Sequence, residues 1–345
     1  MNEYDAARAV IHRGLASRAF PAAVVNVGDR RGRRWQEAFG RLTYTEDAPP
    51  CDLGTIFDLA SLTKVIATAS IAMQTIAHGR MALDTRVADV TPGWSGADRD
   101  VVTIRHLLDH SSGLPAHLRV WTDTSGRAGY EALILRTPLE RPPGQAAIYS
   151  DVGFILLGLI LERLGGTTLD RQLTSVFGRA LDPIQYRPMA SLYERIAPTE
   201  FDPWRGRVLC GEVHDENAAA LGGVAAHAGL FGTADAVGTF ARMVLATFDG
   251  PTPLGTPDLM RTFAARSVVA GSSRALAWDA ALPASSCGRL MSPRAIGHTG
   301  FTGTSIWIDP EKDFYAVLLT NRVHPSRTNE QLLPLRAEFH DALPR

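Results

Sequence analysis

Cysteine is scarce in this chain, and net charge is nearly absent. The three cysteines among 345 residues, Cys51, Cys210 and Cys287, are far apart and form no Cys-x-x-Cys spacing. Their separation argues against a disulfide framework and against a cysteine zinc site, and it suits a reducing compartment. The formal net charge of −1 offers no basic field to nucleic acid or anionic lipid. We therefore expect a small or neutral substrate, no nucleic-acid partner, and neither a metal nor another cofactor.

Long hydrophobic runs are also missing. The longest one, Val152–Leu161, has about half the length that a membrane span requires, so it indicates a buried helix. The first twenty residues form an amphipathic pattern with acidic and basic side chains, without the apolar centre of a signal peptide. These features predict a cytoplasmic protein with no membrane partner, and they leave the oligomeric state open.

Lysine occurs only twice, at Lys64 and Lys312, so 33 of the 35 basic residues are arginine. Arginine is effectively always charged, whereas a desolvated lysine can lose its proton. Where this chain requires only a positive charge, it uses arginine. Each lysine is therefore a candidate for a chemical role.

Strong strand patterns lie near both ends of the chain. The β-branched run Ala22–Val27, a polar turn and Trp35–Phe39 predict one β-hairpin, and Thr304–Ile308 with Phe314–Thr320 predicts a second. Helical patterns dominate the residues between these two hairpins. Strands at both termini with helices between them indicate one sheet domain from 1–80 and 271–345, with a mostly helical region, 81–270, inserted.

Helix patterns have recognisable starts and stops. Apolar periodicity and Gly or Ser/Thr boundaries predict helices over residues 1–20, 61–78, 103–110, 151–164, 168–180, 234–248 and about 329–343. Proline is compatible with the last of these only if Pro334 falls in the first turn. The helix at 61–78 is apolar nearly all round, so we expect it to be buried.

The sequence Ser61-Leu-Thr-Lys64 opens the expected helix at 61–78. Residues three apart on a helix share one face, with Cβ atoms about 5–6 Å apart, so the hydroxyl and the amine are within hydrogen-bonding reach. A buried lysine beside a helix N-terminus has reason to be neutral, and a neutral amine can activate a serine hydroxyl. The alternative is a solvated lysine behind an N-capping serine, which the apolar neighbours disfavour.

The sequence Tyr149-Ser150-Asp151 lies directly before the buried helix at 151–164. A tyrosine at a loop–helix junction can present its phenol to a cleft, where a nearby cation lowers the pKa and allows proton relay. Taken alone, the motif favours a tyrosine at the edge of the core with an N-capping aspartate over a functional tyrosine.

The sequence His298-Thr299-Gly300 precedes Phe301-Thr302-Gly303 and an evident strand. Glycines beside a strand allow a substrate backbone to approach and pair with the edge. The backbone N–H of Phe301 could then join that of Ser61 in an oxyanion hole. A glycine-rich turn with a surface histidine is the structural alternative.

The three motifs follow one another in the order Ser-x-x-Lys, Tyr-x-Asp and His-Thr-Gly, separated by about 90 and 150 residues. In this order the chain resembles the class C β-lactamase and D,D-peptidase branch of the penicillin-recognising serine hydrolases, whose motifs are Ser-x-x-Lys, Tyr-x-Asn and Lys/His-Thr-Gly. The resemblance extends over nearly the whole chain. It includes residues 57–64, 104–115, 143–149 and 221–232.

The resemblance implies an α+β fold of the β-lactamase/transpeptidase-like type, with a mostly antiparallel sheet flanked by helices and an inserted α-helical domain. The active site would lie between the two regions. By the same resemblance Ser61 forms an acyl-enzyme, Lys64 and Tyr149 handle its proton, and a water molecule completes hydrolysis. Substrate contacts and oxyanion stabilisation would involve Asp151, His298, Thr299, Gly300 and Phe301. Which of Lys64 and Tyr149 is the main base stays open.

Two positions depart from the family pattern. Asp151 stands where the family usually has asparagine, so an amide donor becomes a carboxylate acceptor. His298 stands where β-lactamases commonly have lysine. In this respect the chain resembles family members with peptidase, esterase or amidase activity, which have histidine at this position. Together with the expected cytoplasmic location, these departures favour a hydrolase of esters, amides or peptides, including D-amino-acid or muropeptide-like amides, over an enzyme of antibiotic resistance.

Other residues are candidate ligands outside these motifs. His106 and His110 are four residues apart on a helix, without the His-Glu-x-x-His pattern of a zinc site, so a structural role is favoured. The cluster His214-Asp-Glu216 and Asn217 could border the active site, and His227 fits a turn. No Gly-x-Ser-x-Gly elbow, dinucleotide fingerprint or P-loop is present.

Two alternatives to the small-molecule hydrolase stay open. One is a true class C-type β-lactamase, which would require rapid deacylation of penicillins or cephalosporins. The other is a non-catalytic protein that binds a peptide or a cell-wall fragment with this fold. The second has no need for one of only two lysines to follow the serine by three residues, so the sequence favours an enzyme.

Overall fold

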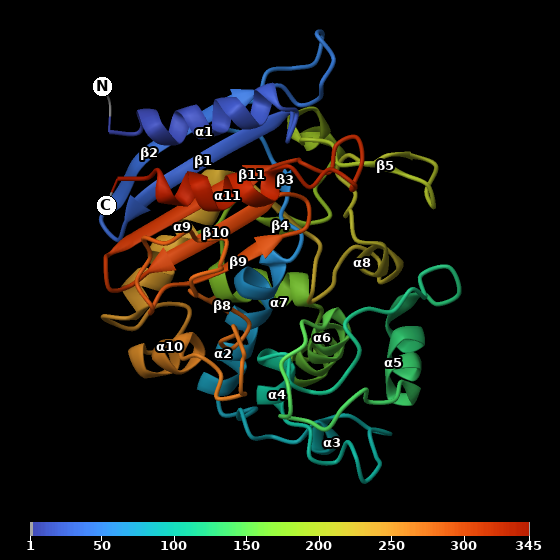
Figure 1. Cartoon of the computed structure of the whole chain (residues 1–345). Helices are drawn as coiled ribbons and strands as arrows, with labels where there is room; N and C mark the ends of the chain where they lie inside the picture. Colours follow the sequence, from blue (N-terminus) through green and yellow to red (C-terminus); the bar gives the residue numbers. More distant parts are fainter. Residues whose placement is uncertain (1–2, 345) are drawn as a thin grey trace.

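Both ends of the chain contribute strands to one six-stranded antiparallel sheet in the computed structural model, which describes residues 3–344 (Figure 1). The strand order is β2-β1-β11-β10-β9-β8. The bounds are β1 (Ala22–Asp29), β2 (Gly32–Gly40), β8 (Asp279–Ala280), β9 (Ile296–Gly300), β10 (Thr304–Asp309) and β11 (Phe314–Thr320). Both expected hairpins are confirmed, and β1 pairs with β11, so the two termini meet in the middle of the sheet.

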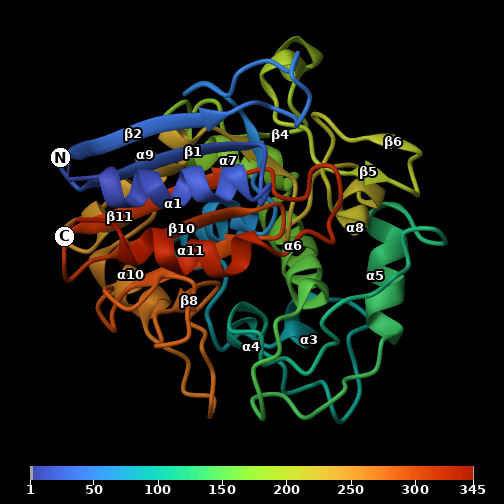
Figure 2. The same ribbon diagram turned by 45° about the horizontal axis from the view of Figure 1, so that its top comes forward.

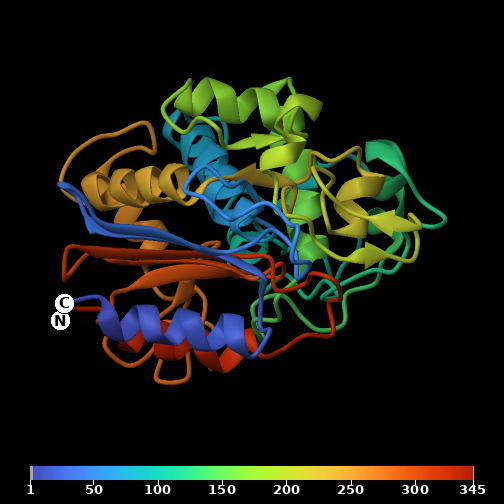
Figure 3. The ribbon, with the colours of Figure 1, turned by 90° about the horizontal axis from the view of Figure 1, so that it is seen from above.

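Helices cover both faces of this sheet. Figure 3 shows α1 (Asp5–Ala16) and α11 (Leu332–Asp341) on one side and α9 (Ala234–Thr247) on the other. Because alternate side chains of a strand point to opposite faces, Val25 packs in the cluster with α1 and α11, whereas Val24 packs in the main core with α9. This double coverage explains why every residue of β1 is buried.

The terminal helices agree with the sequence pattern. The helix expected over 1–20 spans Asp5–Ala16, and the first two residues lie outside the described part of the chain. In α11, Pro334 is the third residue, so it falls in the first turn, where a missing N–H is tolerated. Figure 2 shows α1 and α11 side by side, and Arg13 of α1 forms an ion pair with Glu338 of α11.

The remaining helices gather beside and behind the sheet (Figures 1 and 2). They are α2 (Ser70–Ala77), α3 (Val87–Val90), α4 (Ile104–Leu108), α5 (Gly126–Arg136), α6 (Asp151–Gly165), α7 (Leu169–Phe177), α8 (Glu216–Ala220) and α10 (Pro257–Ala264), with the short helical segments η1 (Lys64–Ala69) and η2 (Ala190–Arg195). The helix α9 belongs to the expected helical region by sequence, yet it packs on β1 and β11. The division into 1–80 with 271–345 and 81–270 stays a prediction.

Two small sheets complete the strands. One has the order β3-β7-β4, from β3 (Phe57–Asp58), β7 (Leu230–Gly232) and β4 (Gln185–Tyr186), and the other pairs β5 (Phe201–Asp202) with β6 (Arg207–Val208). The pairing of β3 with β7 matters for the site. It lays residues 230–232, the end of the glycine-rich segment 221–232, along the residues that lead into Ser61.

The helix expected over 61–78 is present, but part of it is wound differently. Residues 64–69 form η1, a π-helical segment, and α2 continues it to Ala77. All six residues of η1 are buried, which confirms the expected burial of this helix. π-helical turns are rare and occur mostly at functional sites.

The buried helix expected over 151–164 is α6, and its end agrees with the glycine pair in the sequence. Gly166 adopts a left-handed conformation at the C-cap, with φ of 65°. Ten consecutive residues of α6, 152–161, are buried. In residues 3–344 no single helix is long and apolar enough to cross a membrane, although α6 and α7 pass the same test of length and composition as a pair bent by 68°.

Candidate active site

Ser61 lies at the junction between β3 and the η1–α2 helix. The residue before it, Ala60, has φ of 46°, a left-handed conformation that is unfavourable for a residue with a Cβ. The Ala60 N–H donates to the carboxylate of buried Asp58 at 2.8 Å, which holds this turn in place. As a result Ser61 is only partly buried, whereas the residues that follow it are buried.

Lys64 lies directly behind Ser61 and is fully buried. Its Nζ is 3.0 Å from Ser61 Oγ, which confirms the contact expected from the spacing of three residues. Nζ also donates to Asp151 Oδ1 at 2.7 Å and to the carbonyl oxygen of His227 at 2.9 Å. The amine therefore touches the candidate nucleophile, the N-terminus of α6 and the glycine-rich segment at once.

The charge on Asp151 changes the protonation expected for Lys64. Burial alone lowers the pKa of the Lys64 amine, but the Asp151 carboxylate and the nearby Tyr149 outweigh burial and raise that pKa above its usual value. Burial opposes the ionisation of Asp151 too, yet Lys64, a hydrogen bond from His117 and the charge of His227 hold the pKa of its carboxyl far below the ordinary range. The resting pair is an ammonium and a carboxylate, which is the opposite of the neutral lysine expected from the sequence.

Tyr149 is half-buried and presents its ring to the same group of side chains. Lys64 Nζ lies 4.8 Å from the ring centroid, and Arg274 Cζ lies 4.9 Å from it. Burial raises the pKa of the phenol, and the Lys64 charge together with hydrogen bonding to Lys64 and Ser61 opposes that rise. The phenol is therefore neutral at rest, and it can donate a proton.

The motif His298-Thr299-Gly300 forms the last three residues of β9, so it belongs to the sheet and is not a surface turn. His298 is buried, with its ring 5.9 Å from that of Tyr149. Burial, with the charges of Lys64 and Arg274, lowers the pKa of His298 to about 4 despite the opposing charge of Asp279. Nδ1 bonds to the Thr299 carbonyl at 2.8 Å, while Nε2 has no partner among residues 3–344.

The turn after β9 packs directly against the residues before Ser61. Thr302 Oγ1 donates to the Asp58 carbonyl at 2.7 Å, and a Cβ on Gly300 would lie 2.7 Å from the Leu59 carbonyl, so glycine is required there. In the described part of the chain, neither the Ser61 N–H nor the Phe301 N–H donates to a protein acceptor. Two free backbone donors beside the candidate nucleophile are the arrangement that an oxyanion hole needs.

A cleft of about 380 Å³ brings most of the expected site residues together. Six of the eight line it, namely Ser61, Tyr149, His298, Thr299, Gly300 and Phe301. Lys64 and Asp151 lie behind Ser61 and do not line the cleft. The expected contact between Asp151 and substrate stays a prediction.

Three arginines of the cleft have no counterpart in the sequence motifs: Arg274, Arg322 and Arg336. Arg274 forms an ion pair with Asp279. Arg322 and Arg336 are only 5% and 4% exposed, and within residues 3–344 neither forms an ion pair with a carboxylate. They come from the segment after β11 and from α11, and no local pattern distinguishes them among 33 arginines.

Burial lowers the pKa of both guanidinium groups, and for Arg322 the charges of Glu330 and Glu200 oppose this effect. Burial, and then the charge of Arg322, lowers the pKa of Arg336 to about 10. Arg336 Nη2 reaches the Thr304 carbonyl only at 3.5 Å, and its Nε has no partner in the described chain. Arg322 donates to the carbonyls of Arg327 and Asn329 and stacks 4.7 Å from the ring of half-exposed Phe301.

The other candidate ligands of the sequence have structural roles. His106 completes a capping box at the start of α4, and His110 Nδ1 accepts from the Ser150 N–H while its ring packs against Tyr149. Asn217 donates to the Leu118 carbonyl, and His227 bonds to Asp215. No group of three or more potential metal ligands occurs among the described residues.

The cluster at 214–216 stabilises the border of the site. His214 donates its backbone N–H to Asp58, and its ring lies 5.5 Å from that of Phe301. Glu216 forms an ion pair with Arg327, which also binds Glu200. The expected border role for this cluster is thus supported on the side of Phe301.

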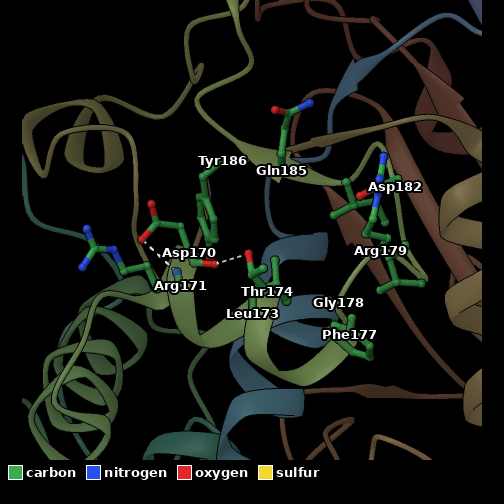
Figure 4. A pocket seen from close by; sticks show the side chains of 12 residues that line it. Asp170, Arg171, Leu173, Thr174, Phe177, Gly178, Arg179, Asp182, Gln185 and Tyr186 are labelled. Atoms are coloured by element: carbon green, nitrogen blue, oxygen red, sulfur yellow. Dashed lines mark hydrogen bonds and ion pairs between the residues drawn. The ribbon is translucent and has the colours of Figure 1, made fainter.

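A larger cavity, of about 570 Å³, lies away from these groups against α7 and the loop that follows it (Figure 4). Its lining contains Leu173, Phe177 and Tyr186 with the charged residues Asp170 and Arg179. None of the expected site residues lines it. The candidate site is therefore identified by its chemistry and not by its size.

A partly exposed serine, a buried lysine in contact with it and two free backbone donors define a serine hydrolase site. The family model described as Beta-lactamase matches residues 7–341. The chain therefore belongs to the Beta-lactamase family, and it is a serine hydrolase of that family.

Curated relatives and solved structures agree with this assignment. A protein of Escherichia coli (strain K12) named "Putative D-alanyl-D-alanine carboxypeptidase" is 33% identical over 314 residues, which cover 81% of this chain and 72% of the relative. An N-acetylmuramyl-L-alanine amidase of Bacillus subtilis (strain 168) is 29% identical over 78% of this chain and 68% of its own length. The structure of EstCE1, a hydrolase with promiscuous acyltransferase activity, has a TM-score of 0.79 at 19% identity, with 99% of this chain and 98% of EstCE1 covered, and supports the fold.

Proposed function

We propose that this hydrolase forms an acyl-enzyme on Ser61 with an ester, amide or peptide that carries an anionic group beside the scissile bond. The single observation behind this proposal is the shared cleft of Ser61, Arg322 and Arg336. A buried charge without an opposite charge beside it is destabilising, so two guanidinium groups that lack a carboxylate partner beside a nucleophile favour an anionic ligand. Arginine matches a carboxylate particularly well, because its planar fork can donate two parallel hydrogen bonds.

The proposed reaction starts from the neutral amine form of Lys64, which increases as pH rises because the pKa of Lys64 is raised. Ser61 Oγ forms a bond to the carbonyl carbon while its proton passes to this neutral amine. The backbone N–H groups of Ser61 and Phe301 stabilise the oxyanion. Collapse of the intermediate breaks the bond to the leaving group, which takes a proton through the Tyr149 phenol. A water molecule then attacks the acyl-enzyme, its proton passes to the same groups, and the acid product leaves with Ser61 restored.

Amino-acid and peptide amides with a free carboxylate are the substrate class that fits best, including D-amino-acid and muropeptide-like amides. The names of the relatives, a carboxypeptidase and an amidase, support this class. His298, which is neutral at pH 7, stands where β-lactamases commonly have a positively charged lysine. The positive charge of the cleft therefore comes from its arginines. The cytoplasmic location expected from the sequence stays a prediction.

The test combines covalent labelling with a matched pair of substrates. Intact-mass spectrometry after brief exposure to p-nitrophenyl acetate, followed by peptide mapping, should find one acetyl group on Ser61, and Ser61→Ala should abolish it. Hydrolysis of an N-acyl dipeptide with a free C-terminal carboxylate is then compared with that of its C-terminal amide. We expect kcat/KM to be at least about tenfold higher for the dipeptide with the free carboxylate. This ratio corresponds to the contribution of about one hydrogen bond to a charged group.

Each result has a distinct meaning. An adduct without preference for the carboxylate would refute the anionic substrate class but keep the acyl-enzyme. Rapid turnover of penicillins or cephalosporins through Ser61 would favour a true β-lactamase. No adduct and no turnover with any of these compounds would favour a binding protein with a hydrolase fold.

A further inference from the structure

Asp58 is a buried acidic residue that lies three positions before Ser61. It is only 2% exposed, and burial raises the pKa of its carboxyl group. Its Oδ1 accepts from the Ala60 N–H at 2.8 Å, and its Oδ2 accepts from the His214 N–H at 2.6 Å. Each oxygen of this carboxylate therefore holds a different segment of the chain.

The backbone at Asp58 holds a third segment. The Asp58 carbonyl accepts from Thr302 Oγ1 at 2.7 Å, and the next carbonyl, that of Leu59, accepts from Thr304 Oγ1 at 3.1 Å. Both threonines are buried, and they belong to the turn after β9 and to the first position of β10. The turn that carries Phe301 is thereby fixed to the residues before Ser61.

These attachments form a closed circuit of contacts. The ring of His214 lies 5.5 Å from that of Phe301, and Phe301 is followed directly by Thr302. The circuit therefore runs from Asp58 through His214 to Phe301, and it returns through Thr302 to Asp58. A displacement of either attached segment would move Phe301 relative to Ser61.

The backbone just before Ser61 also depends on this carboxylate. Ala60 has φ of 46°, and a residue with a Cβ keeps such a left-handed conformation only where its surroundings hold it. The hydrogen bond from the Ala60 N–H to Asp58 contributes to that hold. Because the Ser61 N–H belongs to the peptide bond that follows Ala60, its direction depends on how Ala60 is held.

We propose that Asp58 is a positioning residue that sets the distance and direction of both donors of the oxyanion hole, the backbone N–H groups of Ser61 and Phe301. This inference rests on the proposed function, in which these two donors stabilise the oxyanion. Asp58 does not line the cleft, so it affects the reaction only through the backbone. An oxyanion hole is effective because its donors are fixed before the charge develops, and Asp58 joins the two segments that carry them.

The test compares two substrates that differ in one atom, p-nitrophenyl acetate and its thiono analogue, in which sulfur replaces the carbonyl oxygen. Sulfur accepts hydrogen bonds more weakly than oxygen and lies farther from the carbon, so the oxyanion hole stabilises it less. Each kcat/KM is divided by the rate constant for reaction of the same ester with hydroxide. The ratio of the two quotients, oxygen ester over sulfur ester, then measures the contribution of the oxyanion hole.

Asp58→Asn places an amide N–H group against the N–H of either Ala60 or His214, so one hydrogen bond is replaced by two opposed donors. We expect kcat/KM for the oxygen ester to fall at least about tenfold, which is less than the loss of about 100- to 1,000-fold when a whole oxyanion donor is removed. The value for the sulfur ester should stay within about threefold, because it gains little from the hole. The ratio therefore falls.

Asp309→Asn is the matched control. Asp309 is a fully buried aspartate whose carboxylate accepts from the N–H groups of Ser292 and Glu311, but it lies at the other end of β10 from the cleft. This variant should lower the unfolding temperature, as Asp58→Asn does, and leave the ratio at its wild-type value. The comparison separates a loss of stability from a displaced oxyanion hole.

Thr302→Val tests the Phe301 side of the circuit through one hydrogen bond. It removes the hydroxyl that donates to the Asp58 carbonyl and preserves the shape of the side chain. We expect the ratio to fall at least about threefold, the value of a typical hydrogen bond. Thr302→Ser, which keeps a hydroxyl, should restore the wild-type ratio.

A wild-type ratio in folded Asp58→Asn would overturn the proposal, even if both esters react more slowly, because Asp58 would then be only structural. If Asp58→Asn does not fold, the two Thr302 variants decide, and a wild-type ratio in Thr302→Val overturns the proposal. A wild-type protein that acylates Ser61 without preference for the oxygen ester would refute the oxyanion hole and the role of Asp58 with it. A wild-type protein that forms no adduct would refute the proposed function itself.

Discussion

The two sides of Ser61 differ in how their charges are compensated. On the side of α6 and η1, the Lys64 ammonium contacts the Asp151 carboxylate at 2.7 Å, and His227 contacts Asp215 at the same distance. On the side of α11, Arg322 and Arg336 are buried with no carboxylate partner in the described chain. Lys64 thus has a carboxylate partner within the protein, whereas Arg322 and Arg336 have none among residues 3–344.

This contrast separates chemistry from recognition. Groups that move protons must be held in fixed geometry before substrate binds, so their partners belong to the protein. Groups that recognise an anion gain most when the protein leaves their charge free, although the free protein is destabilised by it. Substitutions on the two sides should therefore act on different quantities.

The largest effect is expected on the compensated side. Lys64→Met removes the base and leaves Asp151 without its cation, so turnover should fall about 10⁴-fold, nearly as far as in Ser61→Ala, because the two groups act as a unit. Steady-state hydrolysis of p-nitrophenyl acetate measures this loss. Lys312→Met, at the other and exposed lysine, is the matched control, and equal activity of both lysine variants would refute the role of Lys64.

A smaller loss is expected for Tyr149→Phe, about 100-fold in kcat for an amide substrate. The phenol is a neutral donor at rest, so its removal should matter most when the leaving group needs a proton. An activated ester with a p-nitrophenolate leaving group should be affected much less. Equal losses for amide and activated ester would indicate that Tyr149 acts on Ser61 instead.

On the uncompensated side, Arg336→Met should raise KM about 10- to 100-fold for the dipeptide with a free carboxylate and leave its C-terminal amide nearly unaffected. The same variant should unfold at a temperature at least about 2 °C higher than wild type, because a buried unpaired charge is removed. Arg294→Met, at an exposed arginine, is the control in both measurements. A lower unfolding temperature would show that Arg336 stabilises the fold and would weaken its assignment to recognition.

The smallest effect concerns His298, which lies between the two sides. Its pKa is lowered to about 4 in the folded protein, from an ordinary value of 6.5. As pH falls from 6.5 towards 4, the unfolded chain takes up a proton that the buried imidazole does not, so stability is lost in that window. His298→Gln should reduce the drop in Tm between pH 7 and pH 5 by a few degrees. The control His78→Gln, at an exposed histidine, should leave this drop unchanged. A drop in Tm for His298→Gln as large as that of the wild-type protein would contradict the lowered pKa.

Much of the fold could be predicted because its patterns are local. The two hairpins, the apolar helix α6 and its glycine C-cap each show a periodicity or a boundary residue within a short window. The short helices α3 and α8 and the two-residue strands β3 and β4 were not predicted, because such elements are too short for a periodicity and form through tertiary contacts. Strand β9 was missed for a related reason, since its two glycines resemble a turn.

The candidate site was predicted through its motifs, and its electrostatics was not. Ser61, Lys64, Tyr149 and His298 meet as the motifs indicated. The protonation predicted for Lys64 was wrong because burial was weighed without Asp151, which is 87 residues away in sequence. Arg322 and Arg336 were missed because each is one arginine among many until the fold brings both to the cleft.

By itself the sequence determined the groups that a helix or strand repeat brings together, above all a serine and a lysine one helical turn apart. Only the tertiary structure decided their charge state and which arginines remain without a carboxylate partner. The physical reason is that burial and Coulomb interactions depend on every group nearby in space, whatever its distance along the chain. The contact of Lys64 with the His227 carbonyl, across 163 residues, is the clearest case.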